Sequence, residues 1–307
     1  MRIYAPSYYK EFSCKADRCR NNCCIGWEID IDPETYDYYQ SVGGQMGDRF
    51  NKSIVHGEDP HFILTEGDRC PFLNKDNLCD IITSLGEDKL CEICAQHPRY
   101  RNFFEEYIEV GIGMSCEEGA RIILNCKDKV KLSLIESNGE KELYNIDEVD
   151  LLDLRDDILD IVQDRNFLVE QRLERLHDAF EISLPNMTIS QWAGQLFTLE
   201  VLDPVWEKYL KVLMNVEEEE LDFAGWDIAF EQILVYFILR HLSDGMYDDR
   251  YKQRIAFALV SLKLIKAVWQ YCLKDLTMEN LQEAARLYSS EIEYSQNNTE
   301  SMLEILE

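Results

Sequence analysis

Residues 226–242 read WDIAFEQILVYFILRHL. Nearly every position on one broad face of this stretch is apolar, and no glycine or proline interrupts it. A helix that is hydrophobic over so much of its surface is typically buried in the middle of a domain. We therefore predict a central buried helix here, with other helices packed around it.

Amphipathic helical patterns flank this stretch on both sides. Apolar residues recur at helical spacing in 151–180, 206–213, 251–273 and 277–288, and 302–306 also reads as a helix. Local signals mark the boundaries. Thr188 followed by Gln191 has the spacing of a capping box, and Asp203-Pro204 breaks or kinks the chain before a helix. The acidic run Glu217 to Glu220 is predicted to be a solvated loop.

The first 126 residues have a different character. Ten of the eleven cysteines fall between Cys14 and Cys126, among short turn signals. A segment with few long amphipathic runs needs a bound metal to hold it together. Two β-branched runs, 107–113 and 129–135, are predicted to form a small hairpin or an edge strand. The predicted fold is mainly α: a small Cys-rich, metal-held module at residues 1–126 packed on an acidic helical domain at residues 127–307.

The charge of the chain limits its partners. Lys and Arg total 31 against 59 Asp and Glu, which gives a net charge of −28 over 307 residues. Such a chain is repelled by nucleic-acid phosphates and by anionic membrane surfaces, and it attracts cationic partners such as a Lys-rich protein surface. The sequence shows no apolar leader and no uninterrupted apolar stretch of about 18 residues. We predict a cytoplasmic protein with reduced cysteines, and the sequence does not indicate its oligomeric state.

Nine clustered cysteines are the candidate metal ligands: Cys14, Cys19, Cys23, Cys24, Cys70, Cys79, Cys91, Cys94 and Cys116. Clustered thiolates select zinc, copper(I) or iron–sulfur clusters. Only Cys91 and Cys94 have the two-residue gap of a zinc knuckle. An iron–sulfur cluster tolerates the irregular spacing of the others, because the cluster itself sets the ligand geometry. The spacing therefore favours iron–sulfur and leaves zinc open.

Three further residues lie near the cysteine blocks or carry a thiol themselves. His97, three positions after Cys94, could be a ligand, although packing or hydrogen bonding is the more frequent role of such a histidine. Cys126 and Cys272 are predicted to be small buried hydrophobic side chains. The sequence has no Rossmann glycine motif, no P-loop, no nucleophile elbow and no zinc-protease motif, so none of these classes is indicated.

The cysteine blocks and their surroundings resemble the flagellin lysine N-methylase family, which is related to Cys-rich zinc- and iron-chelating proteins. The motifs that carry the resemblance are Tyr4-Ala-Pro-x-Tyr-Tyr-Lys10, Cys23-Cys24-x-Gly-Trp27, Cys70-Pro-Phe-Leu73, Leu90-Cys91-x-x-Cys94 and Ser115-Cys116-x-Glu-x-Ala120-Arg121. They span residues 1–126, and the helical remainder is similar in character more than in motif. The resemblance implies methyl transfer from S-adenosylmethionine to the ε-amines of flagellin lysines, with a four-iron, four-sulfur (4Fe-4S) cluster on the cysteines.

The resemblance also suggests where the substrates bind. Aromatic walls can hold a sulfonium or an alkylated amine by cation–π contact, and Tyr4, Tyr8, Tyr9 and Trp27 are the candidates near the first cysteines, with ordinary packing as the alternative. Glu117 and Glu118 are candidate bases, with exposed acid as the alternative.

Two other functions remain open. One is a non-catalytic zinc- or iron-binding or delivery protein that uses the same cysteines. The other is a zinc-stabilised module that presents acidic helices to a partner.

Overall fold

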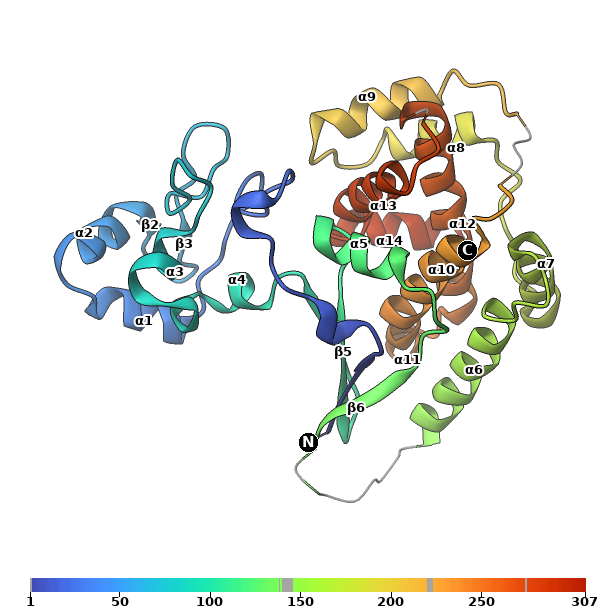
Figure 1. The fold of residues 1–307 in the computed structure, drawn as a ribbon, viewed down its shortest axis with the longest axis horizontal. Helices are drawn as coiled ribbons and strands as arrows, with labels where there is room; N and C mark the ends of the chain where they lie inside the picture. Colours follow the sequence, from blue (N-terminus) through green and yellow to red (C-terminus); the bar gives the residue numbers. More distant parts are fainter. Residues whose placement is uncertain (1, 138, 140–145, 220–222, 274) are drawn as a thin grey trace. The chain divides into compact units, whose positions relative to one another are not determined.

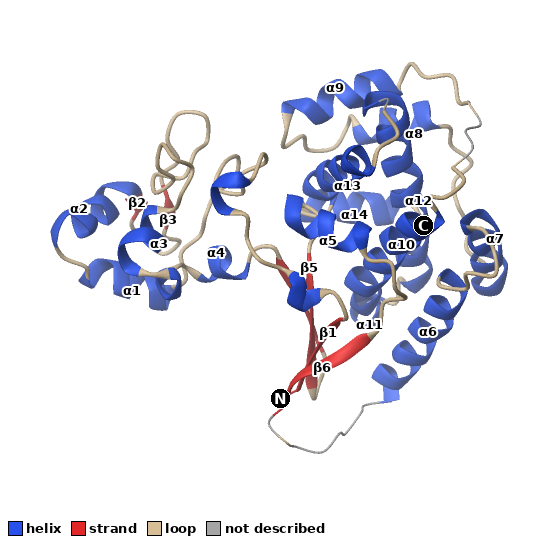
Figure 2. Cartoon of the chain, viewed as in Figure 1, coloured by secondary structure: helices blue, strands red, loops and turns tan. Residues whose placement is uncertain are grey.

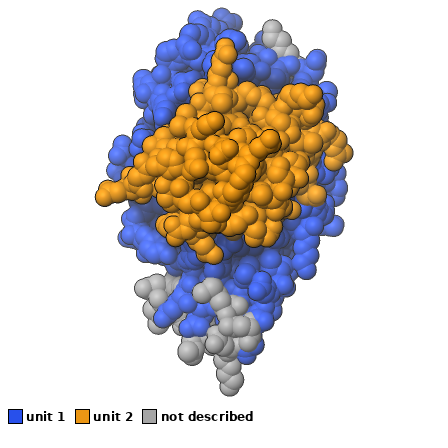
Figure 3. Space-filling model, turned by 90° about the vertical axis from the view of Figure 1, so that its left-hand side faces the viewer, with its two compact units in different colours: residues 1–12, 100–307 blue, residues 13–99 orange. Residues whose placement is uncertain are grey.

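The computed structural model describes residues 2–137, 139, 146–219, 223–273 and 275–307. The chain divides into two compact units, coloured separately in Figure 3. Unit 2 is the segment 13–99, and unit 1 combines the N-terminal residues up to Phe12 with residues 100–307. These units do not coincide with a division at residue 126, because the segment from Tyr100 to Cys126 contributes strands and a helix to unit 1.

Helices make up most of unit 1, as Figures 1 and 2 show. Its α-helices are α5 Glu117–Asn125, α6 Ile146–Val162, α7 Val169–Phe180, α8 Ile189–Leu196, α9 Pro204–Leu213, α10 Asp227–His241, α11 Gly245–Asp248, α12 Tyr251–Ala267, α13 Met278–Ile292 and α14 Gln296–Ile305. Short 3-10 segments are η1 Tyr9–Glu11 and η4 Leu242–Asp244, and the π-helical η5 Val268–Leu273 extends α12. The mainly helical prediction is confirmed.

The predicted central helix is α10. From Ala229 to Leu239 every residue of α10 is buried, including the polar Glu231 and Gln232. It packs against α12, α5, α6 and α7. Helix α12 with η5, over Tyr251–Leu273, is apolar and long enough to cross a membrane, but 72% of that apolar window is buried inside the protein. It contacts α10, α13 and α14 and acts as a core helix.

A four-stranded sheet belongs mostly to unit 1 (Figure 2). Its order is β4 Arg99–Phe103, β5 Tyr107–Ile112, β1 Arg2–Pro6, β6 Leu132–Ser137. Strand β1 pairs in parallel with β5, Ile3 opposite Ile108, and antiparallel with β6. The two predicted strands exist as β5 and β6. They do not pair as a hairpin, but β6 is an edge strand, as the alternative predicted. Strand β1, from the chain's beginning, lies between them, and the chain leaves β5 through α5 before it reaches β6.

The predicted helix boundaries at two caps are confirmed. The Thr188 side chain accepts from the Gln191 backbone N–H at 3.2 Å, and the Gln191 side chain accepts from the Thr188 N–H at 2.9 Å. The Asp203 carboxylate accepts the Val205 N–H at 2.8 Å and so opens α9 at Pro204. Glu217 to Glu219 are exposed, as predicted for a solvated loop, and Glu220 lies outside the described residues.

Unit 2 has its own aromatic core. Its elements are α1 Pro33–Ser41, α2 Gly44–Ser53, β2 Ile54–Val55, β3 His61–Phe62, α3 Asp80–Leu85 and α4 Glu92–Gln96, with 3-10 turns η2 Ala16–Arg18 and η3 Glu87–Lys89. The ring of Tyr39 stacks on Phe50 with centroids 4.0 Å apart, and Phe72 packs against Phe50 and Phe62. Buried cysteines line the same core, which places the candidate ligands beside it.

Candidate functional site

Five of the predicted ligands converge on the core of unit 2. They are Cys24, Cys70, Cys79, Cys91 and Cys94. Cys70 and Cys91 are fully buried, and the other three are partly buried. The backbone N–H of Cys70 donates to the carbonyl of Cys24 at 2.8 Å, which ties the first cysteine block to the second. Cys91 begins α4 as its N-cap, so Cys94 lies one turn further on the same helix.

Hydrogen bonding and burial set the protonation of these thiols. Cys91 and Cys94 share a thiol–thiol hydrogen bond, which lowers the pKa of Cys91 and raises that of Cys94. Burial raises the pKa of Cys70 to about 11 and also raises that of Cys79. Protonated thiols must lose their protons when they bind a soft metal, so binding here would release protons.

Cys23, which is hydrogen-bonded to Cys24, contacts Trp27 within unit 2. The pKa of Cys23 is raised chiefly by its hydrogen bond to Cys24, and a hydrogen bond to His97 partly offsets the shift. The Trp27 indole N–H donates to the Cys23 carbonyl, and its ring lies 5.8 Å from the His97 ring. His97 therefore packs and hydrogen-bonds near the cysteines.

The remaining predicted ligands lie elsewhere. Cys14 is exposed, its sulfur accepts the Ala16 N–H at 3.4 Å, and Cys19 is partly exposed. Cys116 belongs to unit 1, where it is the N-cap of α5. Cys126 and Cys272, predicted to pack, are partly buried against the core of unit 1. Within the described ranges, no three thiols have sulfur atoms within 4.8 Å of one another.

The candidate substrate-binding aromatics are divided between the units. Tyr4 packs edge-on against Tyr107 at 5.4 Å, and Tyr8 is buried at 2% exposure in unit 1. Burial raises the pKa of Tyr8, and its hydroxyl lies near Tyr236. Tyr9 packs at the edge of the unit 1 core. Trp27, in contrast, belongs to unit 2.

The candidate bases Glu117 and Glu118 are not exposed acids. Both are buried in the first turn of α5, at 8% and 7% exposure. The Glu118 carboxylate accepts two hydrogen bonds from the Arg121 guanidinium, at 2.6 and 2.8 Å. This two-bond ion pair fixes the side chain, so Glu118 acts as a structural anchor.

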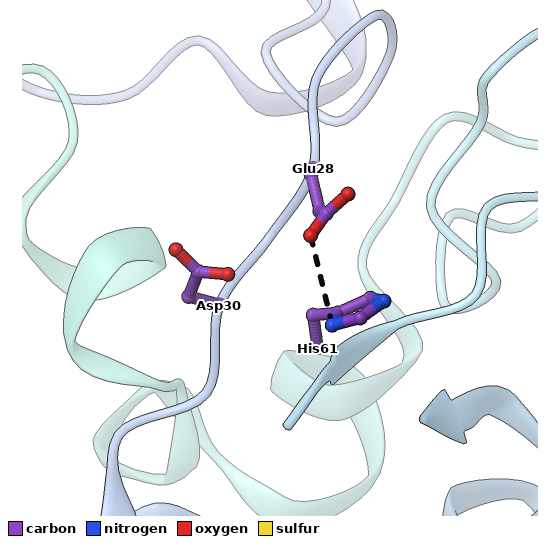
Figure 4. A group of neighbouring side chains, drawn as sticks. All are labelled: Glu28, Asp30 and His61. Atoms are coloured by element: carbon purple, nitrogen blue, oxygen red, sulfur yellow. Dashed lines mark ion pairs between the residues drawn. The ribbon is translucent and has the colours of Figure 1, made fainter. Parts of the chain in front are cut away.

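One candidate ligand trio has no signal in the sequence. Glu28, Asp30 and His61 bring their ligating atoms within 4.8 Å of one another (Figure 4). An antiparallel bridge pairs Asp30 with His61, and His61 Nδ1 lies 3.6 Å from the Glu28 carboxylate and 2.9 Å from the Asp59 carbonyl. His61 follows Asp30 by 31 positions in the sequence, so no spacing motif could reveal the three residues together.

A buried polar network in unit 1 was also missed. The Tyr236 hydroxyl donates to Glu293 at 3.1 Å and accepts the Met114 N–H at 3.1 Å. His241 Nε2 lies 2.6 Å from the same carboxylate. Burial alone would raise the pKa of Glu293, but Arg240 and the His241 hydrogen bond lower it below its ordinary value. The periodicity of α10 marks Tyr236 only as a core position, so no local pattern indicates the network.

The C-terminal part of the chain is similar to a known domain. Residues 187–307 match the FliB lysine N-methylase C-terminal domain. The resemblance to flagellin lysine N-methylases is confirmed. The family domain lies over α8 to α14, whereas the motifs that first suggested the family lie in residues 1–126.

Three curated relatives extend this similarity. The chain is 27% identical over 139 residues to the lysine-N-methylases of Salmonella typhimurium and Salmonella choleraesuis, which is 43% of this chain and 34% of each relative. It is 26% identical over 151 residues to the flagellar biosynthetic protein FliU of Salmonella muenchen, 47% of this chain and 85% of that relative. The match thus spans about a third of each lysine-N-methylase. No solved structure matches the chain.

Proposed function

We propose that this chain is a protein-lysine N-methylase whose substrates are flagellin-type lysines and whose methyl donor is S-adenosylmethionine. The observation that carries the proposal is the match of residues 187–307 to the C-terminal domain of FliB lysine N-methylases. Supporting it, the chain's charge of −28 attracts a lysine-bearing surface, and methylation leaves lysine positive.

The proposal includes a 4Fe-4S cluster held by cysteines of unit 2. The donor set fits such a group, because Cys70, Cys79, Cys91 and Cys94 are soft ligands gathered on one core. Cys24, bonded through its backbone to Cys70, is the nearest alternative ligand. A bound cluster would supply redox or Lewis-acid chemistry and would hold unit 2 together. Zinc on the same thiols is the competing occupant.

The chain's own residues must solve one chemical problem. A lysine ε-ammonium has no lone pair, so its nitrogen must lose a proton before it takes a methyl group. In the balanced transfer, the carbon–sulfur bond of the sulfonium breaks, a carbon–nitrogen bond forms, and the amine proton leaves to a base or to water. A desolvated acceptor site lowers the lysine pKa and so favours the neutral amine.

The test uses the full chain purified without oxygen. Iron and acid-labile sulfide are measured with the visible spectrum, and the protein is then incubated with S-adenosylmethionine and flagellin. Mass spectrometry of flagellin peptides is expected to show added methyl groups on lysine, dependent on both the chain and the donor. Metal-loaded protein that leaves flagellin unmethylated would overturn the proposal and favour a metal-binding or delivery protein.

A further inference from the structure

Three tyrosine rings surround the guanidinium of Arg240. Its Cζ lies 5.4 Å from the ring centroid of Tyr100, 5.8 Å from that of Tyr236 and 5.3 Å from that of Tyr294. The Arg240 Nε lies 3.2 Å from a carboxylate oxygen of Glu293. Cations within about 6 Å of aromatic centroids are attracted by the ring faces. We call these three tyrosines and Glu293 the cation cage.

Arg240 Nη1 donates to the Tyr236 hydroxyl at 2.5 Å, and the cage walls also make contacts that do not involve Arg240. Gly111 of β5 lies so close to the Tyr100 ring that any Cβ there would collide with it. The Tyr236 hydroxyl is fixed between the Met114 N–H and Glu293. His241 holds the same carboxylate from a second direction. These contacts hold Tyr100, Tyr236 and Glu293 in place if the arginine side chain moves away.

The residues of the cage become more exposed from Glu293 towards Tyr294. The Glu293 side chain has no exposure, the Arg240 side chain is 13% exposed, and Tyr294 is 39% exposed. Arg240 lies in the last turn of α10, and its flexible side chain reaches the cage beside the exposed ring. A cation arriving from solvent would thus meet Tyr294 first and Glu293 last.

Charge balance determines what can replace the arginine. A buried carboxylate left without a partner costs several kcal/mol, so the occupant of the cage must be a cation. Exchange of Arg240 for another monovalent cation keeps Glu293 neutralised. Methylated ammonium groups keep the charge and add apolar surface, which suits aromatic walls.

We propose that the cation cage binds the side-chain ammonium of a protein lysine, and that Arg240 is an internal cation which the lysine displaces. This inference rests on the proposed function and assigns its acceptor-binding site to unit 1. It replaces Tyr4 and Trp27 as the aromatic walls, because those rings pack against Tyr107 and His97 instead.

The test measures binding without a methyl donor. Two ligands are titrated by calorimetry into wild type and Arg240→Ala. One is blocked lysine, which is acetylated at its α-amine and amidated at its carboxyl and keeps its ε-ammonium; the other is blocked norleucine, its uncharged counterpart. Removal of the internal competitor should tighten lysine binding about tenfold, and norleucine should bind neither protein. Equal lysine affinities, or norleucine binding as tightly as lysine, would overturn the proposal. If Arg240→Ala folds poorly, restoration of its melting temperature by blocked lysine becomes the expected result, and the absence of any shift counts against the cage.

A second variant keeps the buried pair intact. Tyr294→Ala should weaken lysine binding about fivefold, and Tyr294→Phe should restore it, because the ring and not the hydroxyl faces the cation. Tyr247, 75% exposed on α11, provides the matched control, and Tyr247→Ala should bind like wild type.

Flagellin methylation by the same variants separates the two proposals. Lysine binding without methyl transfer would support the cation cage and contradict the proposed methylase activity. Methyl transfer by Tyr294→Ala with an unchanged KM for flagellin would contradict the cation cage and support the proposed methylase activity.

Discussion

Glu109 and Arg155 form a buried, doubly hydrogen-bonded ion pair that joins β5 to α6. The two bonds measure 2.7 and 2.8 Å, and the side chains are only 5% and 6% exposed. The pair connects the sheet to the first long helix of unit 1, and both elements carry other buried residues.

Removal of one partner should destabilise unit 1. Glu109→Gln leaves the Arg155 charge buried without its counter-ion, so we expect the free energy of unfolding to fall by about 3 kcal/mol. Urea unfolding followed by circular dichroism measures the loss. Arg175→Ala, which breaks the exposed pair with Asp164, is the matched control and should leave the unfolding midpoint nearly unchanged. Equal effects of the two substitutions would contradict the prediction.

Glu291 should make stability depend on pH. Its carboxylate accepts the N–H groups of Leu202 and Asp203 at 2.9 and 2.6 Å, and burial raises its pKa from 4.5 to about 7. The pKa of Glu291 is higher in the folded than in the unfolded chain. Its contribution to the free energy of unfolding is therefore complete below pH 4.5 and is lost as the pH rises towards 7. Glu291→Gln should lack this decline, which amounts to about 3 kcal/mol. Urea unfolding of both proteins across this range is the measurement, and parallel pH profiles would refute the assignment.

Two glycines should respond oppositely to alanine. Gly111→Ala forces the Tyr100 ring away from β5, so we expect about 2 kcal/mol of destabilisation and weaker lysine binding. Gly194→Ala, inside α8 with nothing within 4 Å of the new Cβ, should stabilise by about 0.5 kcal/mol or more. Thermal melts of both variants test this. A stable Gly111→Ala protein with unchanged lysine affinity would show that the Tyr100 ring has another place to go.

The metal content should depend on the cysteines of unit 2 and not on all cysteines alike. Cys91→Ser removes a fully buried thiol at the start of α4, so most of the bound iron and the visible absorption should disappear. Cys272→Ser, on the helical core of unit 1, should retain both. Iron analysis of anaerobically purified proteins decides the matter. Loss of iron from both variants, or from neither, would contradict this ligand set.

The sequence predicted the local features of unit 1 well. The apolar run of α10, the capping box at Thr188 and the Asp203-Pro204 boundary are signals within one or two helical turns, and the structure confirms each. The prediction that Tyr107 and its neighbours form a strand was also right. The prediction that this strand pairs with residues 129–135 in a hairpin was wrong, because periodicity does not encode which distant strands pair.

The sequence by itself determined that this chain is mainly helical, acidic and rich in clustered thiols, since composition and periodicity are properties of neighbouring residues. Only the tertiary structure decided which side chains meet. It assigned Cys116 to unit 1 and the other eight candidate ligands to unit 2, and it inserted β1 between β5 and β6. It also gathered Tyr100, Tyr236, Tyr294 and Glu293 around Arg240. Such contacts depend on the long-range packing of a strand, a helix and a helix end. Tyr100 and Tyr294 are 194 positions apart, so their contact leaves no local pattern in the sequence.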